Sequence, residues 1–493
     1  MQGLIGPLKE LAEFEELCKN KKKDVGMIRV CGCVNSQKSH MMYALGDGCK
    51  YKVIACSSET KAKQIYEEYR FLDSNTYLYP AKDFLFYQAD IRSKELVKQR
   101  MEGIQAVLSG EPVTVVTSLD GFMDHLAPKE SIAEKVLKIQ NDSVLKLDEM
   151  AEKLSVIGYD REVQVEGPGQ FAVRGGILDI YPLTEELPVR IELWGDEVDS
   201  IRTFDVESQR SIENLMDIVI YPAVEFPQNG EKGVSFLDYF PPEDTILFLD
   251  EPVRLVERGQ NIEDEFMEAQ KKRLESGYDL EEEEAKIFPV TEILKKINCY
   301  SSIGFYALGM KCKGLEVRES YEIQAKSVNP YNNSFEMLTQ DLKRLKRNGY
   351  RVILLSGSRT RAKRLAEDLR DYDLSSFYSE DMVRTVRPGE IMVVYGCVAE
   401  GYEYPMLKFM VISESDIFGK RKKKRRRKVY EGQKIQEFAE LKPGDYVVHE
   451  NHGLGVYQGI EKVEVDKVTR DYMKISYADG GILYILATQM DLI

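Results

Sequence analysis

Residues 32–39, GCVNSQKS, have the residue types and spacing of a phosphate-binding loop. The segment follows the apolar run 27–31 and precedes a helical pattern, which is where backbone N–H groups can face an anion. Gly32, Lys38 and Ser39 match the fixed positions of the pattern G-x-x-x-x-G-K-[ST], apart from its second glycine. In such loops the lysine reaches the β- and γ-phosphates of ATP. The chemistry to consider first is therefore nucleotide hydrolysis.

A second motif would complete such a site, but one substitution argues against it. The apolar run TILFL ends at Asp250 and Glu251, which could hold magnesium and orient water. Gln37, however, occupies the place of the second glycine, which permits the turn and the close approach of the backbone to phosphate. We predict a degenerate, inactive nucleotide site and no catalytic residues. The alternative is an ATP-dependent nucleic-acid enzyme that uses 32–39 with both carboxylates.

Two arginines and the single tryptophan form a candidate binding surface. Arg190 and Trp194 fall on the same face of a predicted strand because side chains alternate along it, and Arg174 ends the preceding strand. Tryptophan and arginine are enriched among the residues that dominate binding energy. The alternative is that Trp194 covers a sheet edge while the arginines pair with Glu192 or Asp196.

The cysteines and histidines indicate no metal site. The chain has eight cysteines and four histidines but no CxxC pair, and Cys31-x-Cys33 has no second pair to complete a tetrahedral set. His449 and His452 lack the spacing of a zinc-protease helix. We expect reduced thiols.

The elements that position the nucleotide-like loop alternate as in a parallel α/β sheet. Apolar runs typical of buried strands alternate with helical patterns. The predicted strands are 27–31, 52–56, 76–80 and 112–118, and the predicted helices between them are 57–72 and 93–108. A second α/β pattern occupies 323–418.

The arginine-bearing region and the C-terminal region show β patterns. Residues 129–222 contain paired strands with a hairpin turn at Gly195-Asp196, which suggests an α+β module. The last 50 or so residues alternate short strands with glycine turns, as in a small β-barrel. Its stretch 452–465, with Ile460, Val463 and Val465, could accept a partner strand by β-augmentation or could pack in the core.

Composition predicts a soluble, cytoplasmic, multidomain chain. It has 493 residues, 43% of them hydrophobic, and no apolar run of the roughly 20 residues a membrane helix needs. The net charge of −15 argues against most of the surface lying on nucleic acid. The basic run KRKKKRRRK at 420–428 is either a solvated tether or a weak, nonspecific nucleic-acid contact.

Long stretches of the chain resemble the bacterial transcription-repair coupling factors. Residues 167–212, from GPGQFAVRGG to SQRSI, are similar to the second domain of that family, itself similar to the UvrA-binding part of the excision-repair protein UvrB. Residues 79–88, 400–419 and 444–465 look like the family in the same order. The resemblance covers nearly the whole chain.

The resemblance implies a multidomain α/β fold class. It comprises a degenerate UvrB-like and RecA-like α/β head with an inserted α+β domain, a small α/β domain, and a C-terminal small β-barrel of the CarD or Tudor type. The implied boundaries are 1–128 for domain 1A with the degenerate loop, 129–222 for domain 2, 223–322 for domain 1B, 323–418 for domain 3, 419–438 for a basic linker and 439–493 for the RNA-polymerase-interacting barrel.

The resemblance also implies an adaptor that recruits UvrA to RNA polymerase stalled at DNA damage. UvrA would bind Arg174, Arg190 and Trp194, and the polymerase β subunit would bind the barrel near Ile460, Val463 and Val465. The family's full-length chains continue into an ATP-driven DNA translocase and a C-terminal domain that masks the UvrA surface. We therefore expect no enzymatic activity and no cofactor for this chain, with ATP, magnesium and most DNA contact belonging to the missing domains.

Overall fold

The computed structural model describes most of the chain. The described residues are 2–21, 24–82, 94–227, 231–275, 287–309, 312–380, 383–419, 444–449, 453–465, 468–477 and 481–486. They belong to two compact units, one formed by Met1–Lys82 with Lys98–Arg421 and the other by Asp83–Val97 with Lys422–Ile493. The expected linker 419–438 lies outside the described residues except for Gly419.

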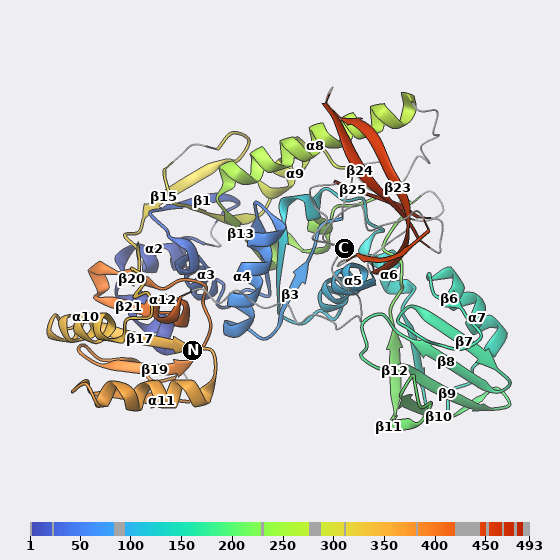
Figure 1. Cartoon of the computed structure of the whole chain (residues 1–493), viewed down its shortest axis with the longest axis horizontal. Coiled ribbons are helices and arrows are strands. Elements are labelled where there is room, and N and C mark those ends of the chain that lie inside the picture. Colours follow the sequence, from blue (N-terminus) through green and yellow to red (C-terminus); the bar gives the residue numbers. More distant parts are fainter. Residues whose placement is uncertain are drawn as a thin grey trace. The chain divides into compact units, whose positions relative to one another are not determined.

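A seven-stranded parallel sheet forms the head of the first unit (Figure 1). Most of its strands are continuous apolar runs with little exposure, as parallel strands covered on both faces require. The strands are, in spatial order, β15 (Val317–Glu322), β1 (Gly26–Cys31), β14 (Ser301–Tyr306), β13 (Thr245–Asp250), β2 (Tyr51–Cys56), β4 (Val113–Ser118) and β3 (Thr76–Tyr79). The regions 1–128 and 223–322 therefore build one sheet, which we call the head.

The two head helices predicted at 57–72 and 93–108 are present as α4 and α5. Ser58 caps α4 because its hydroxyl accepts a hydrogen bond from the N–H of Lys61. The strands and helices predicted between 27 and 118 are confirmed. The head helices are α3 (Asn35–Leu45), α4 (Glu59–Leu72), α5 (Lys94–Leu108), α8 (Pro252–Glu275) and α9 (Val290–Ile297), and the N-terminal segment forms α1 (Gln2–Ile5), η1 (Gly6–Glu10) and α2 (Ala12–Asn20).

Residues 129–222, which we call the inserted domain, combine helices with two β-sheets, in keeping with the predicted α+β character. The two-residue turn Gly195-Asp196 joins β9 to β10 and places Glu197 opposite Trp194. Its sheets have the orders β11-β10-β9-β8-β7-β6 and β12-β5. The elements are β5 (Leu137–Gln140), β6 (Asp160–Arg161), β7 (Gln170–Arg174), β8 (Ile177–Tyr181), β9 (Val189–Trp194), β10 (Glu197–Phe204), β11 (Ser211–Leu215), β12 (Asp217–Ile220), α6 (Lys129–Glu134) and α7 (Leu147–Val156).

The small α/β domain, 323–418, has a mixed six-stranded sheet. Strands β17, β18, β19 and β21 are parallel, and β20 and β16 continue the sheet in antiparallel pairs, in the order β16-β20-β21-β17-β19-β18. The elements are β16 (Lys326–Ser327), β17 (Arg351–Ser356), β18 (Ser376–Ser379), β19 (Ile391–Tyr395), β20 (Tyr402–Tyr404), β21 (Phe409–Ile412), α10 (Phe335–Arg347), α11 (Arg359–Arg370), α12 (Glu414–Phe418) and η5 (Pro405–Leu407).

The C-terminal region of the second unit is an antiparallel four-stranded sheet within the described residues. The order is β22 (Tyr446–His449), β23 (Gly453–Val465), β24 (Val468–Ser476) and β25 (Ile482–Leu486). The alternating strands predicted from the sequence are therefore present. The described strands do not establish the closure that a barrel requires.

Candidate functional site

The segment 32–39 follows β1 as predicted, but only residues 32–34 connect the strand to α3, which already begins at Asn35, and Gly32 does not serve a phosphate. Gly32 has a φ of 78°, and a Cβ there would lie 2.3 Å from the carbonyl oxygen of Ile323. The N–H of Ile323 in turn donates to the carbonyl of Cys31. Glycine is therefore required at position 32 because the chain leaving β15 passes against it.

Lys38 is bound by the two carboxylates that were predicted to hold magnesium. Its Nζ lies 2.7 Å from Oδ1 of Asp250 and 2.6 Å from Oε1 of Glu251, and the group is largely buried. Burial by itself would lower the pKa of Lys38, but the two carboxylates outweigh burial and raise the pKa. The ammonium group of Lys38 is therefore charged. The two carboxylates already balance that charge, so the group would bind a phosphate only weakly.

Gln37 is fully buried and contributes both ends of its amide to hydrogen bonds. Its Oε1 accepts from the N–H of Val34 at 3.2 Å, and its Nε2 donates to the hydroxyl of Tyr404 at 3.0 Å. Tyr404 belongs to β20 of the small α/β domain. The residue that breaks the phosphate-loop pattern is therefore the one that contacts the neighbouring domain.

His40 extends this set of hydrogen bonds to the N-terminal segment. Its Nε2 lies 3.0 Å from the carbonyl oxygen of Leu4, which can only accept, so Nε2 carries the proton. Its Nδ1, 3.1 Å from the Tyr404 hydroxyl, then accepts from that hydroxyl. Burial lowers the pKa of His40 to about 4, which keeps the ring neutral and this direction of donation fixed.

The serine that would bind magnesium is engaged as well. The hydroxyls of Ser36 and Ser39 donate to the buried carboxylate of Glu68 at 2.7 and 2.6 Å. The N–H of Ala399, from the small α/β domain, donates to the same carboxylate. In this arrangement the lysine and both carboxylates of the motif are bonded to one another and the serine is bonded to Glu68, so these groups are engaged within the protein rather than arranged around a triphosphate. The ATPase alternative gains no support from this geometry.

A buried carboxylate organises the predicted arginine surface. Asp179, on β8, accepts from Nε and an Nη of Arg190 at 2.7 and 2.9 Å and from an Nη of Arg174 at 2.6 Å. The alternative in which these arginines pair with Glu192 or Asp196 is therefore replaced by pairing with Asp179. Asp179 lies between them because its strand pairs with both neighbouring strands, which the sequence pattern alone does not reveal.

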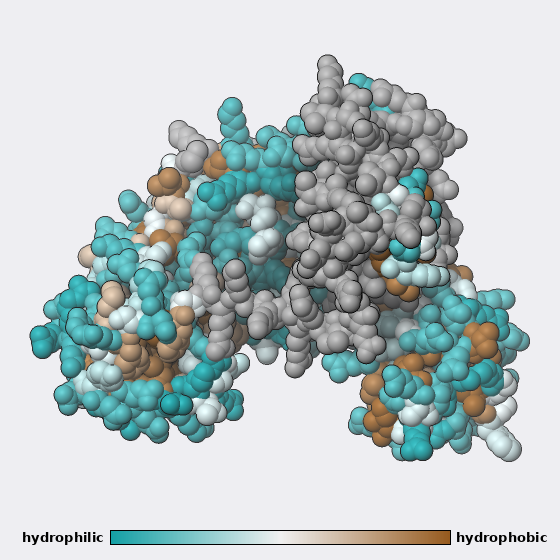
Figure 2. Space-filling model, viewed as in Figure 1, coloured by the Kyte–Doolittle hydropathy of each residue, from teal (hydrophilic) through white to brown (hydrophobic). Residues whose placement is uncertain are grey.

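The three predicted residues of this surface differ in exposure. The side chain of Arg190 is 14% exposed and its guanidinium covers the ring of Phe204, whereas that of Arg174 is 44% exposed. Trp194 is 84% exposed at the end of β9. Hydrophobic residues occur among hydrophilic ones on the visible face of this domain (Figure 2). Arg174 and Trp194 are thus available to a partner, and Arg190 is mainly part of their support.

The predicted polymerase contacts lie on β23. Ile460, Val463 and Val465 pair with Met473, Arg470 and Val468 of β24, but their side chains are outside the described part of the structure. Residues 453–456 also pair with β22. Within the described residues, the predicted open edge is therefore confined to the later part of the strand.

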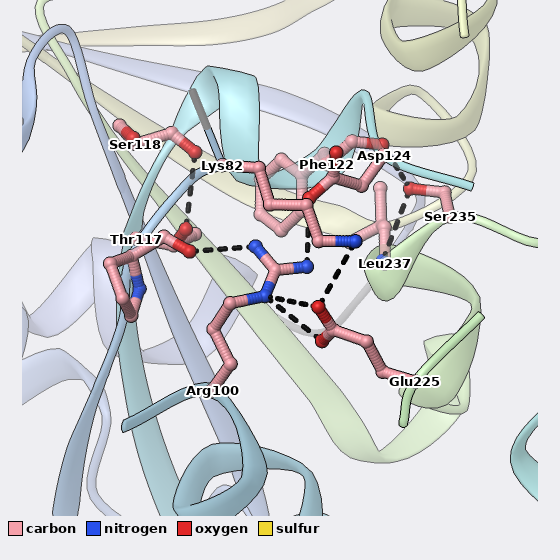
Figure 3. Close-up of polar contacts among 10 residues, drawn as sticks. Lys82, Arg100, Thr117, Ser118, Phe122, Asp124, Glu225, Ser235 and Leu237 are labelled. Atoms are coloured by element: carbon pink, nitrogen blue, oxygen red, sulfur yellow. Dashed lines mark hydrogen bonds and ion pairs between the residues drawn. The ribbon is translucent and has the colours of Figure 1, made fainter. Parts of the chain in front are cut away.

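Sequence reasoning missed a buried ionic cluster around Arg100 (Figure 3). Arg100 is fully buried, with Nε 2.9 Å from both carboxylate oxygens of Glu225, an Nη 2.7 Å from Asp124, and another donating to the carbonyl of Pro80. Lys82 lies 3.1 Å from the same glutamate. Burial would raise the pKa of Glu225, but the two cations lower it to about 2.

The Arg100 cluster connects the segment that enters the inserted domain with the segment that leaves it. Asp124 precedes that domain and Glu225 follows it, so one guanidinium holds both. A signal for it exists in the sequence, because Arg100 falls beside Met101 and Ile104 on the apolar face of α5. A charged residue at such a position requires a buried partner.

Among the described residues, no group of three or more histidine, cysteine, aspartate or glutamate side chains is arranged to hold a metal ion. No helix in the described part of the chain is both long enough and apolar enough to cross a membrane.

Two parts of the chain match domains of known protein families. A family model described as the UvrB interaction domain matches residues 137–226, and one described as the CarD-like/TRCF RID domain matches residues 441–493. Over most of its length the chain is similar to transcription-repair coupling factors. The coupling factor of Bacillus subtilis (strain 168) is 27% identical over 98% of this chain and 46% of its own length.

Other coupling factors give the same picture. Those of Staphylococcus haemolyticus (strain JCSC1435) and Staphylococcus aureus (strain MRSA252) are each 26% identical, over 85% and 86% of this chain. The matches cover 40% and 41% of these two relatives, so the chain spans less than half the length of the coupling factors it resembles. The resemblance recognised in the sequence, with its UvrB-like and CarD-like domains, is confirmed.

Proposed function

We propose that this chain is the adaptor region of a transcription-repair coupling factor, which recruits UvrA to RNA polymerase stalled at DNA damage. The observation that carries the proposal is the match of residues 137–226 to a UvrB interaction domain, because it falls on the domain that presents Trp194. The CarD-like match at 441–493 supports a second contact, with the polymerase. The chain would then connect two proteins by binding each through a different domain.

UvrA would bind the inserted domain around Arg174 and Trp194. An exposed tryptophan offers a large apolar area that a partner can cover, and an adjacent arginine can pair with an acidic group. Arg190 would act mainly through Asp179 and Phe204, since little of its side chain is exposed. In the full-length protein a further domain would mask this surface.

The β subunit of RNA polymerase would bind the C-terminal sheet along β23. The strand segment that includes Ile460, Val463 and Val465 pairs only with β24 among the described residues. Such a segment can add a partner's strand by main-chain hydrogen bonds.

In this proposal the chain works by recognition in the cytoplasm, with neither ATP nor magnesium bound at 32–39. ATP hydrolysis, and most of the contact with DNA, would belong to other parts of the full-length coupling factor. The buried pairing of Lys38 with Asp250 and Glu251 supports this division.

The UvrA surface is tested by capture of purified UvrA on the immobilised chain. We expect Arg174→Ala combined with Trp194→Ala to weaken capture by about 30-fold or more, because a hot-spot residue contributes roughly 2 kcal/mol. Arg344→Ala, an exposed arginine of the small α/β domain, is the matched control. Undiminished capture by the double variant would show that UvrA binds elsewhere.

The polymerase surface is tested by Val463→Arg, with binding to the isolated β subunit as the measurement. We expect weaker binding and an unchanged circular dichroism spectrum. Glu464→Arg is the control, because neighbouring positions of a strand point to opposite faces. Equal binding by Val463→Arg and the unaltered chain would remove this strand from the interface.

A further inference from the structure

The head and the small α/β domain meet at the degenerate loop. Besides the Gln37–Tyr404 bond, the hydroxyl of Ser36 accepts from the N–H of Glu400, and Asn35 donates to the carboxylate of the same residue. These contacts come from the loop and the start of α3 on one side and from residues 399–404 on the other. Asn35, Ser36 and Gln37 therefore each have a hydrogen-bond partner in the small α/β domain.

A directed series of hydrogen bonds crosses this interface. It runs from Gln37 to Tyr404, from Tyr404 to His40, and from His40 to the carbonyl of Leu4. All three side chains are buried, so opening the interface would leave donors and acceptors without partners unless water entered. Tyr402 also stacks on the His40 ring, with centroids 5.3 Å apart.

The apolar core is continuous across the same interface. One cluster of buried side chains includes Ile28 and Phe248 of the head sheet together with Leu355 and Phe409 of the small domain. An ionic contact lies farther along, where Arg351 of β17 binds both carboxylate oxygens of Glu10 at 2.6 and 2.7 Å. Apolar burial and polar pairing therefore act together to hold the domains closed.

We propose that residues 32–40 form a locked joint that makes the head and the small α/β domain a single rigid body. Interfaces between domains are where ligands commonly bind and where hinge closure responds to them. Here side chains of the chain itself are bonded to one another around residues 32–40. This proposal does not depend on which proteins bind the inserted domain or the C-terminal sheet.

The joint is tested by hydrogen exchange of the whole chain with Gln37→Leu and with Tyr404→Phe. Each variant removes polar contacts across the interface while keeping most of the side-chain volume. We expect amide exchange in 34–40 and 399–404 to rise about tenfold or more, as the loss of a buried hydrogen bond implies. Unchanged exchange in both segments for both variants would overturn the proposal.

Two matched variants separate the joint from general destabilisation. Tyr300→Phe removes a buried hydroxyl bonded to the carbonyls of Leu237 and Phe240, entirely within the head. Gln340→Leu alters a glutamine of α10 whose amide donates to Glu336 of the same helix. We expect both to leave exchange in 399–404 as it is in the unaltered chain. An equal rise in these controls would count against the joint.

The unaltered chain supplies a test that needs no variant. Core amides of β13 in the head and of β21 in the small domain should show the same dependence of exchange on urea, because a single body opens as one unit. Addition of MgATP should leave exchange in 399–404 unchanged. Separate urea dependences, or a response to MgATP, would each contradict a locked joint.

Discussion

Asp179 illustrates how one buried residue determines what two surface residues can do. It is 1% exposed, yet it binds the arginine that ends β7 and the one within β9. The arginines were identified from the sequence because tryptophan and arginine on one strand face suggest binding. The aspartate was not, because a lone acidic residue among the apolar positions of β8 has no pattern of its own.

The arginines should therefore differ in their effect on stability. Arg190→Ala deletes hydrogen bonds to a buried charged group and should lower the free energy of unfolding by about 2 kcal/mol. Arg174→Ala should change it by less than about 1 kcal/mol, because nearly half of that side chain is exposed. Urea denaturation measures both. Equal losses would mean that Arg190 is no more structural than Arg174.

His40 gives the stability of the chain a defined pH dependence. Its pKa is about 4 in the folded chain, below the ordinary value of 6.5, so the unfolded chain binds the proton more readily. Stability should be complete above pH 6.5, fall as the pH drops, and level off below about 4. The total loss is about 3 kcal/mol, at 1.36 kcal/mol for each unit of pKa difference.

The measurement is the urea midpoint between pH 7 and 4, compared with that of His40→Gln. Other groups titrate in this range, so the difference between the two proteins isolates the histidine. We expect the variant to lose less stability on acidification, because glutamine takes up no proton. Parallel curves for the two proteins would show that the ring is not the group responsible.

At the scale of elements, the sequence predicted the strands and helices between 52 and 118 and the hairpin at Gly195, but not the contacts between elements. Apolar runs bounded by caps and turns identified these elements, since such signals are local. The partner of Gln37 lies 367 positions away, and the charges paired with Arg100 lie on segments before and after the inserted domain. Such pairings depend on the tertiary fold, which no local pattern encodes.

Among the polar contacts that hold helices in the head, we expect the Arg100 cluster to contribute most to the free energy of unfolding. Arg100→Met leaves Glu225 and Asp124 buried, with only Lys82 nearby, and should cost about 3–5 kcal/mol of unfolding free energy. Lys98→Met, on the same helix, removes only a partly exposed pair with Glu102 and should cost less than about 1 kcal/mol. Urea denaturation of both variants is the test, and similar small losses would contradict the assigned role.

At the scale of the whole molecule, segments far apart in the sequence build one sheet and one interface. Regions separated by the inserted domain contribute to one sheet, and the loop at the edge of that sheet is bonded to the small α/β domain. The sequence showed that the nucleotide motif was degenerate because Gln37 departs from the pattern. It did not show which contacts Gln37 and its neighbours make. Tyr404 and Glu68 cannot be recognised as partners of residues 32–39 without the tertiary structure.

Restoring the glycine should therefore not restore nucleotide binding. In Gln37→Gly the loop regains the consensus residue, but Lys38 remains paired with Asp250 and Glu251, and Ser39 remains bonded to Glu68. A fluorescent ATP analogue with magnesium should show no saturable binding to the variant up to about 1 mM, a free energy of roughly 4 kcal/mol. Micromolar affinity that disappears when Lys38→Ala is added would mean that Gln37 alone had closed the site, and that the carboxylates release the lysine to phosphate. Without such binding, the incapacity belongs to the assembled site, in which Lys38 and Ser39 stay bonded within the head while Gln37 contacts the small α/β domain.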